Sequence, residues 1–212
     1  MKPVKPTKDT LSRSYILQAA LAFLDRENLQ NFTMRKLGSE MGVSPMAVYR
    51  YFPNQGALFD GLVELIWQKA LIMKSNSKNS SWQEQAISLM SQLRQTLSDH
   101  PHVLSLISTH PLVTQSEFIL AEKILTNLVE KGLEIHSTTV FLINSLTVYT
   151  LGFVWAEAVE PKDGGEVDPK LLKDLQDHSD ILDQLMKPIQ NNQFTSDQQF
   201  LMGINAILNG WE

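Results

Sequence analysis

The sequence predicts an all-α protein in which a small N-terminal group of three helices is joined by a fourth helix to a larger C-terminal helical bundle. Two observations support this fold class. Apolar residues recur at spacings of three and four along most of the chain. No segment alternates polar and apolar residues between hairpin turns, as strands do. With 212 residues and 43% hydrophobic content, the chain can bury a core in one or two domains.

Helix breakers and capping residues divide the N-terminal third into four expected helices. Serine, threonine and asparagine begin helices because their side-chain oxygen accepts a free backbone N–H, whereas asparagine and glycine end them because they tolerate positive φ. Proline suits the first helical position. The expected starts are Thr10 or Ser12, Thr33, Ser44 with Pro45, and Asn54, and the expected ends of the first three helices are Asn28, Gly42 and Phe52.

A polar run at residues 75–81 marks the expected domain boundary, because it is rich in serine and asparagine and short enough to act as a hinge. We therefore expect one domain over residues 10–70 and a second over residues 71–212. Ser196 and Gln199 have the spacing of a capping box for the last helix. The helices expected in the second domain lie near residues 82–99, 103–109, 114–131, 137–159, 169–187 (intact or broken) and 196–209.

The segment 140–159 is apolar and long enough to span a bilayer, but it contains several polar residues, among them Asn144, Thr150 and Glu157. We therefore expect a buried helix in a soluble core and no membrane contact. The N-terminal residues lack the apolar stretch of a secretory signal. Without cysteine the chain has no disulfide, thiolate nucleophile or cysteine-based metal site. These features favour a cytoplasmic protein without a cofactor.

Two short helices separated by Gly42, Val43 and Ser44 match the helix-turn-helix plan. Glycine can adopt the left-handed turn, and Val43 fills the angle between the helices. If Val48 and Phe52 face the core, the remaining positions of the third helix point outward near its N-terminus, where side chains can meet base edges and phosphates. These outward positions are Pro45, Met46, Tyr49 and Arg50, whereas Tyr51 is compatible with either direction.

The segment from about residue 10 to residue 66 resembles the DNA-binding domain of TetR-type transcriptional regulators. It shares the pattern T-x-R-x-L from residue 33, G-V-S from residue 42 and Y-x-x-F from residue 49. The resemblance implies that residues of both short helices contact DNA. In detail, it implies that Thr33 and Arg35 meet phosphate or groove edges, that Pro45, Met46 and Ala47 lie against bases, and that Tyr49 donates a hydrogen bond to a phosphate.

The chain departs from the family pattern at two positions. Gln55 stands where the family usually has a phosphate-binding lysine, and Tyr51 stands where a histidine often precedes the phenylalanine. Loss of one cation should lower the salt dependence of DNA binding by about one unit per lost phosphate contact. A basic arm of Lys2, Lys5 and Lys8 could compensate, or it could be a solubilising tail.

The C-terminal region is similar to tetracycline-repressor-like domains at residues 108–111, 128–133 and 149–155. The resemblance implies that helices 137–159 and 196–209 form a four-helix bundle with a second copy and that the helices between enclose an effector cavity. Tetracycline repressors proper hold a drug-bound magnesium ion through a histidine just before Thr-x-Pro. Leu106 occupies that place here, so we do not expect tetracycline as the ligand.

The candidate effector-binding residues are aromatic, thioether or polar side chains on the C-terminal helices, as expected of a site for a small apolar or drug-like molecule. Each could equally be ordinary core. Asn144 stands out, because a buried amide needs a partner, which a ligand or the dimer mate could supply. His100 and His102 straddle Pro101 rather than share a helix face, so we expect hydrogen-bonding roles and no metal site. The effector candidates are Met90, His100, Phe118, Phe141, Asn144, Tyr149 and Trp155.

Together these features predict a homodimeric DNA-binding regulator, most simply a repressor released from a palindromic double-stranded operator by a small-molecule effector. In the alternative, the C-terminal domain only dimerises or docks a protein partner. We expect no enzyme and no catalytic residue, because the chain lacks a Cys/His nucleophile pair, a glycine-rich phosphate loop and a metal-spaced Glu-x-x-His.

The charge distribution agrees with DNA binding at one end of the chain. The net charge of -5 at first argues against an anionic partner. However, residues 1–60 hold eight basic and five acidic residues, a charge of +3, whereas the remainder holds ten basic and eighteen acidic residues, a charge of -8. The sequence therefore predicts a modestly basic DNA-binding domain on an acidic body.

Overall fold

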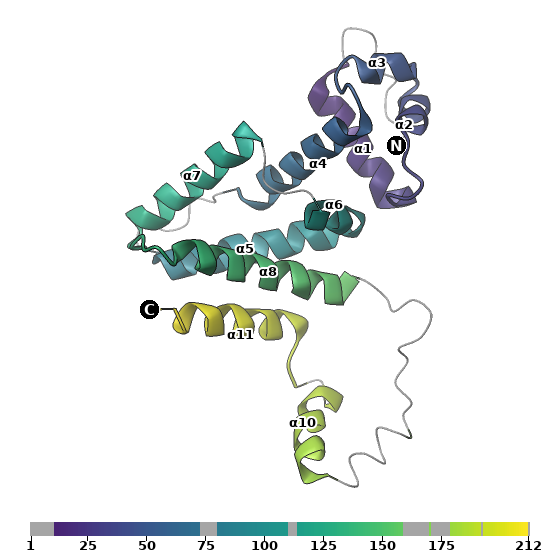
Figure 1. Ribbon diagram of the computed structural model, residues 1–212. Helices are drawn as coiled ribbons and strands as arrows, with labels where there is room; N and C mark the ends of the chain where they lie inside the picture. Colours follow the sequence, from purple (N-terminus) through teal and green to yellow (C-terminus); the bar gives the residue numbers. More distant parts are fainter. Residues whose placement is uncertain are drawn as a thin grey trace. The chain divides into compact units, whose positions relative to one another are not determined.

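The computed structural model describes residues 11–72, 80–109, 114–158, 170, 179–191 and 193–211, and it confirms the all-α fold (Figure 1). The chain divides into two compact units, residues 1–135 and 136–212. The first unit contains α1 (Arg13–Glu27), α2 (Met34–Met41), α3 (Pro45–Tyr49), α4 (Gln55–Ala70), α5 (Trp82–Asp99), the 3-10 helix η1 (Pro101–Val103), α6 (Leu104–Thr109) and α7 (Gln115–Glu130). The second contains α8 (Thr139–Ala158), α10 (Asp180–Gln190) and α11 (Ser196–Asn209).

The capping residues expected in the N-terminal third are confirmed. In each case the side-chain oxygen accepts a hydrogen bond from the backbone N–H three residues later, which satisfies one of the free donors of the helix start. Asn28 and Gly42 end α1 and α2 with φ of 66° and 69°. The four caps are Ser12, Thr33, Ser44 and Asn54.

Several helix boundaries differ from expectation. The third helix ends at Tyr49 rather than at Phe52, and the helix expected from residue 137 begins at Thr139. The capping box of α11 uses Thr195 and Gln198, one residue earlier than predicted. The run Thr-Ser-Asp-Gln-Gln contains two overlapping boxes, so spacing alone could not choose between them.

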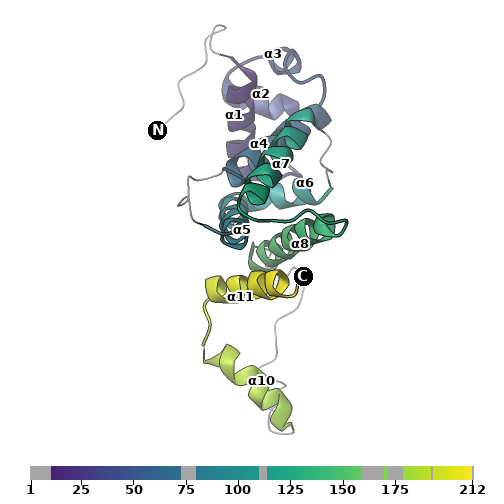
Figure 2. The same ribbon diagram turned by 90° about the vertical axis from the view of Figure 1, so that its left-hand side faces the viewer.

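The core of the first unit is built around α4, which packs on α1 at its N-terminal end and on α5, α6 and α7 further along (Figures 1 and 2). Helices α1, α2 and α3 form a three-helix head at one end of α4. Ile16, Leu37, Phe52, Leu58 and Leu62 are completely buried where α4 meets this head. The expected boundary after residue 70 falls inside this unit, because α4 also packs on α5. The division into domains 10–70 and 71–212 stays a prediction.

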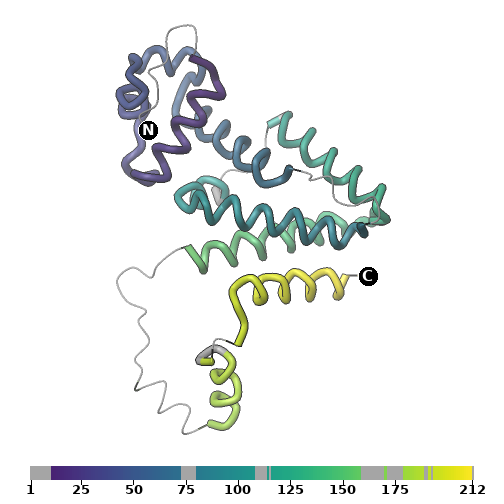
Figure 3. Tube along the Cα trace, turned by 180° about the vertical axis from the view of Figure 1, so that it is seen from behind, coloured from purple at the N-terminus to yellow at the C-terminus, as the bar shows by residue number. Residues whose placement is uncertain are grey.

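In the second unit α8 and α11 lie side by side (Figure 3). The Tyr149 ring lies against Phe153 and Phe200, and its hydroxyl is 3.3 Å from the carbonyl oxygens of Gln199 and Phe200. Gly203 permits this close approach, because a Cβ there would lie 2.1 Å from the tyrosine oxygen. Tyr149 therefore joins the two helices.

The helix expected to be buried at residues 140–159 is buried on one side only in the single chain, as α8 over Thr139–Ala158. Only one stripe of α8 is buried, at the three- and four-residue spacing of a helix packed on one side. By length and mean hydropathy (1.5) alone α8 could cross a membrane, but its buried stripe and its contact with α11 are those of a packed helix. The buried residues are Thr139, Leu142, Leu146, Thr150 and Val154.

Candidate nucleic-acid interface

The turn between α2 and α3 is held by close backbone packing. Gly42 adopts the left-handed conformation that the turn requires, and Val43 N–H donates to the Gly38 carbonyl at 2.9 Å. A Cβ on Gly38 would lie 3.2 Å from the Val43 oxygen and 3.3 Å from the Pro45 Cα atom. The small residue thus lets the start of α3 approach α2, and this contact fixes the angle between the two helices.

Packing of α3 against the core determines which of its side chains face solvent. Val48 and Phe52 are completely buried, whereas Met46 is 69% and Tyr49 41% exposed. Arg50 is exposed as well. The outward orientation expected for these three residues is confirmed, and α3 therefore presents a thioether, a phenol and a guanidinium to solvent. Pro45 and Ala47 are only half-buried, so they can also be approached from outside.

The cations of the head divide into those with a partner and those without. Arg26 pairs with Glu40, and Lys36 Nζ donates to the Asn31 carbonyl at 2.9 Å. Within the part of the chain that the structure describes, the guanidinium groups of Arg35 and Arg50 have no ion pair and no hydrogen bond. These two groups are therefore available to an anionic partner without breaking an internal contact.

Arg13 has a structural role instead. Its guanidinium carbon lies 4.3 Å from the centroid of the Phe52 ring, and Nη1 donates to the Tyr51 carbonyl at 3.4 Å. The Tyr51 hydroxyl in turn donates to the Leu11 carbonyl at 2.5 Å. Tyr51, whose direction the sequence left open, thus connects the end of α3 to the start of α1. The contact spans 40 residues, and no local pattern could have revealed it.

Thr33 and Gln55 lie at helix N-termini. Thr33 is exposed, but its hydroxyl oxygen caps α2 by accepting from Lys36 N–H at 3.1 Å. Gln55 is the first residue of α4, directly after the cap Asn54, and is half-buried. Its side chain is neutral at the point where the family pattern places a lysine.

The seven effector candidates are divided between the two units. Met90, His100 and Phe118 belong to the first, and Phe141, Asn144, Tyr149 and Trp155 belong to the second. Asn144, which we expected to be buried, is exposed in the single chain, as are Phe118, Phe141 and Trp155. The apolar pattern of α8 continues around the helix, so the sequence could not show which face would pack. Tyr149 joins α8 to α11, and His100 is bonded to Asp25.

Sequence analysis did not single out two amide side chains that each bury a polar atom, Gln85 on α5 and Asn127 on α7. Gln85 Nε2 and Asn127 Oδ1 have no hydrogen-bond partner in the described part of the chain. Lys131 Nζ donates to Ser80 Oγ at 2.7 Å, which joins the start of α5 to the end of α7. Each amide lies about one helical turn along its own helix from this contact. A buried polar atom without a protein partner is a candidate to bind a polar group of a small molecule.

The geometry of the head agrees with the comparison to known proteins. Residues 16–62 match the sequence profile described as "Bacterial regulatory proteins, tetR family". Residues 76–212 match the profile described as "Tetracyclin repressor-like, C-terminal domain". The chain belongs to the TetR family of transcriptional regulators. Its head is accordingly the helix-turn-helix DNA-binding domain of that family.

Individual relatives are more distant. The chain is 28% identical to the HTH-type transcriptional repressor DrrR1 of Streptomyces coeruleorubidus over 135 residues, which cover 62% of this chain and 48% of that protein. The matched region spans about half the length of the curated relatives.

Two solved structures of ligand complexes show the same fold. ActR of Streptomyces coelicolor in complex with actinorhodin has a TM-score of 0.71 and 18% identity, covering 94% of this chain and 96% of that one. A variant of TetR from Acinetobacter baumannii AYE in complex with minocycline has a TM-score of 0.74 and 20% identity, covering 95% of this chain and 93% of that one.

Replacing Gln55 with lysine tests whether this position faces a phosphate. We expect Gln55→Lys to increase affinity for duplex DNA severalfold at about 0.1 M salt and to steepen the dependence of log K on log [salt] by about one unit, because one more counterion is released. Fluorescence anisotropy over a salt series measures both quantities.

The matched control is Gln83→Lys, which adds the same charge at an exposed position of α5. We expect the control to leave the salt slope unchanged. Equal slopes for the two variants would show that residue 55 lies away from the DNA backbone.

Proposed function

We propose that this protein is a cytoplasmic, homodimeric repressor that binds a palindromic DNA operator and is released from it by a small-molecule effector. The observation that carries the DNA-binding part is the exposed face of α3, which we take as the recognition helix, together with the guanidinium groups of Arg35 and Arg50, which have no ion pair or hydrogen bond among the described residues. The +3 charge of residues 1–60 favours the same partner. We assign base contact to Pro45, Met46 and Ala47, and phosphate contact to Thr33, Arg35, Tyr49, Arg50 and Gln55. Tyr51, whose hydroxyl donates to the Leu11 carbonyl, supports this surface by fixing the end of α3.

The DNA-binding residues can be tested without a known operator. Duplexes are enriched by the protein from a random-sequence pool, and the enriched duplex is titrated by fluorescence anisotropy. We expect an inverted repeat. Arg35→Ala should weaken binding about tenfold and reduce the salt slope by about one unit, because one phosphate contact is lost. Tyr49→Phe should weaken binding about fivefold through loss of one hydrogen bond.

Lys123→Ala serves as the control, because it removes an exposed cation from α7, outside the head. We expect wild-type affinity from this variant. If Arg35→Ala and Tyr49→Phe also bound with wild-type affinity, the assignment of these two residues would be wrong.

A homodimer is supported by the apolar face that α8 leaves exposed. Phe141, Val148 and Trp155 recur along this face at a spacing of seven, which places them on one stripe of the helix. Met202 of α11 is exposed as well. An exposed apolar stripe of this length is typical of an interaction surface. We propose that a second copy covers it, which would also pair two recognition helices for the half-sites of a palindrome.

The dimer is tested by placing a charge in the stripe. Val148 is 57% exposed in the single chain, so Val148→Glu should leave the monomer folded but bury an unpaired carboxylate in the dimer. We expect light scattering after gel filtration to shift from the mass of two chains to that of one. Val129→Glu on α7, where the side chain is 45% exposed, should stay dimeric. A dimeric Val148→Glu variant would exclude this face.

We place the effector site in the proposed C-terminal domain, residues 71–212. Within the first unit, Gln85 and Asn127 supply polar groups, Met90 supplies a half-buried thioether, and Phe118 supplies an exposed aromatic ring. The fold is shared with two proteins whose solved structures hold actinorhodin and minocycline. Leu106 is buried and offers no metal ligand, so we propose an aromatic effector that binds without a metal ion.

A thermal-shift screen tests this assignment. We expect at least one polycyclic aromatic compound, with actinorhodin among the probes, to raise the stability by about 2.7 kcal/mol at a hundred times its Kd and to lower affinity for the enriched duplex. Minocycline with Mg²⁺ should give no shift. Gln85→Leu should weaken ligand binding, whereas Gln83→Leu, an exposed position on the same helix, should not.

Compounds that bind without changing DNA affinity would contradict release by effector. A library without any binder would favour a C-terminal domain that only dimerises or docks a protein partner.

A further inference from the structure

His100 lies at a junction of three helices. It ends α5, and its ring Nδ1 is 3.0 Å from both carboxylate oxygens of Asp25 near the end of α1. Its other ring nitrogen, Nε2, is 3.4 Å from Nζ of Lys69 in the last turn of α4. The His100 side chain is 17% and the Asp25 side chain 29% exposed, so the contact is largely shielded from solvent. The head, α4 and α5 therefore meet at one imidazole.

The partners of the two ring nitrogens indicate which nitrogen donates and which accepts. An ammonium group can only donate, so His100 Nε2 must accept from Lys69. A carboxylate accepts, so Nδ1 must carry the proton that faces Asp25. These contacts match an imidazole that donates from Nδ1 to Asp25 and accepts at Nε2 from Lys69.

Protonation of His100 would change the two sides of the junction in opposite ways. A proton on Nε2 would point at the Lys69 ammonium and replace a hydrogen bond with repulsion between two cations. The contact with Asp25 would become a bond between opposite charges and would strengthen. The polar contact between the end of α4 and the His100 ring would then be lost, while the contact between the ring and Asp25 of α1 stays.

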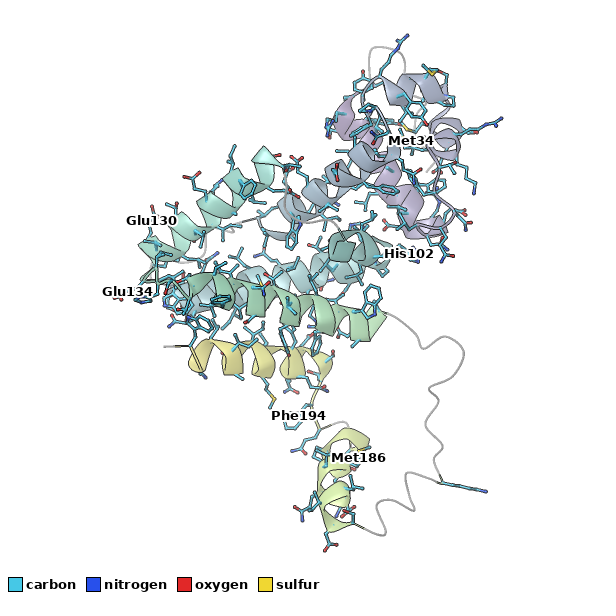
Figure 4. All side chains as sticks on the ribbon, viewed as in Figure 1. Met34, His102, Glu130, Glu134, Met186 and Phe194 are labelled. Atoms are coloured by element: carbon cyan, nitrogen blue, oxygen red, sulfur yellow. The ribbon has the colours of Figure 1, made fainter. Side chains whose placement is uncertain are left out.

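The neighbouring groups do not duplicate this junction. His102 in η1 donates from Nδ1 to the Leu24 carbonyl at 2.6 Å, so it joins α1 to η1 without contacting a charged group through that nitrogen (Figure 4). Asp99 precedes His100 and accepts from Gln95 Nε2 at 2.9 Å. The charged groups that the described contacts place against the His100 ring are Asp25 from α1 and Lys69 from α4.

We propose that His100 is a proton-responsive positioning residue that holds the head, α4 and α5 in the arrangement that binds DNA. When neutral it joins the three helices, and when protonated it releases α4. A dimer reads two half-sites only if both heads keep their spacing, so a looser α4 lowers the population of the binding arrangement and with it the affinity. The inference rests on the proposed DNA-binding function and adds regulation by acidification to it.

The direction in which DNA affinity changes on acidification distinguishes the proposed role of His100 from a simple gain of positive charge. Protonating a histidine adds positive charge and by itself strengthens binding to DNA. The junction predicts the opposite for His100. We measure the affinity for the enriched duplex at about pH 8 and about pH 5.5 in the wild type and in His100→Gln. We expect acidification to lower the wild-type affinity about fivefold more than that of His100→Gln. Lys69→Met should show the same flattened profile, because it retains His100 but removes the opposing cation. His102→Gln is the matched control and should follow the wild type.

Two measurements examine the junction without DNA. Nitrogen-15 NMR of the histidine rings should show the proton of His100 on Nδ1 at about pH 8. Hydrogen exchange of residues 64–70, corrected for the intrinsic pH dependence, should accelerate on acidification in the wild type but not in Lys69→Met.

The outcomes are separable. If the DNA affinities of the wild type, His100→Gln and Lys69→Met depend on pH in the same way, the proposal is overturned even though all three bind DNA. A proton found by NMR on Nε2 of His100 at about pH 8 would overturn it as well. If no duplex is enriched, the DNA-binding proposal fails, while the exchange of residues 64–70 still decides whether protonation of His100 releases α4.

Discussion

The packing of α4 is the constraint on which the first unit depends. Its apolar side chains are buried along its whole length, against α1 near Leu58 and against α5, α6 and α7 near Ile66 and Ala70. Gly61 brings it closer still to the head, because a Cβ there would lie 3.0 Å from Leu17 Cδ2 and 3.2 Å from Phe52 Cε1. A close-packed interface of this kind does not deform continuously, so a displacement of α4 requires the head to move with it or to repack.

The same packing determines which charges are available for DNA. Burial of Val48 and Phe52 turns the other face of α3 outward, and the Phe52 ring also receives Arg13. Arg13 is thereby used to fix the end of α3, while Arg35 and Arg50 stay unpaired within the described residues. A basic composition alone does not distinguish these roles. The distinction comes from long-range contacts that assign some cations to the fold and leave others for a partner.

The sequence was informative wherever the structural cause was local. Caps such as Thr33 and Asn54 act over three residues, and the turn at Gly42 depends on one backbone conformation, so both were predictable. Asn144 was not, because α8 is apolar around most of its circumference and its buried face is chosen by α11. The contact between His100 and Asp25 joins residues 75 apart, and neither residue stands in a local pattern that indicates the other.

The contacts of His100 connect the C-terminal end of α4 to the head of the first unit. Ala70 is buried at the C-terminal end of α4, and Lys69 beside it reaches the same imidazole that holds Asp25 of the head. A change near the end of α4 can therefore reach the head by two paths, along the packed helix and across the imidazole. The packed helix transmits a displacement of α4 to the head. The hydrogen bonds through the imidazole depend on the charge of the His100 ring. If the proposed effector also acts through α4, its effect on DNA affinity and the effect of a proton on His100 would be coupled.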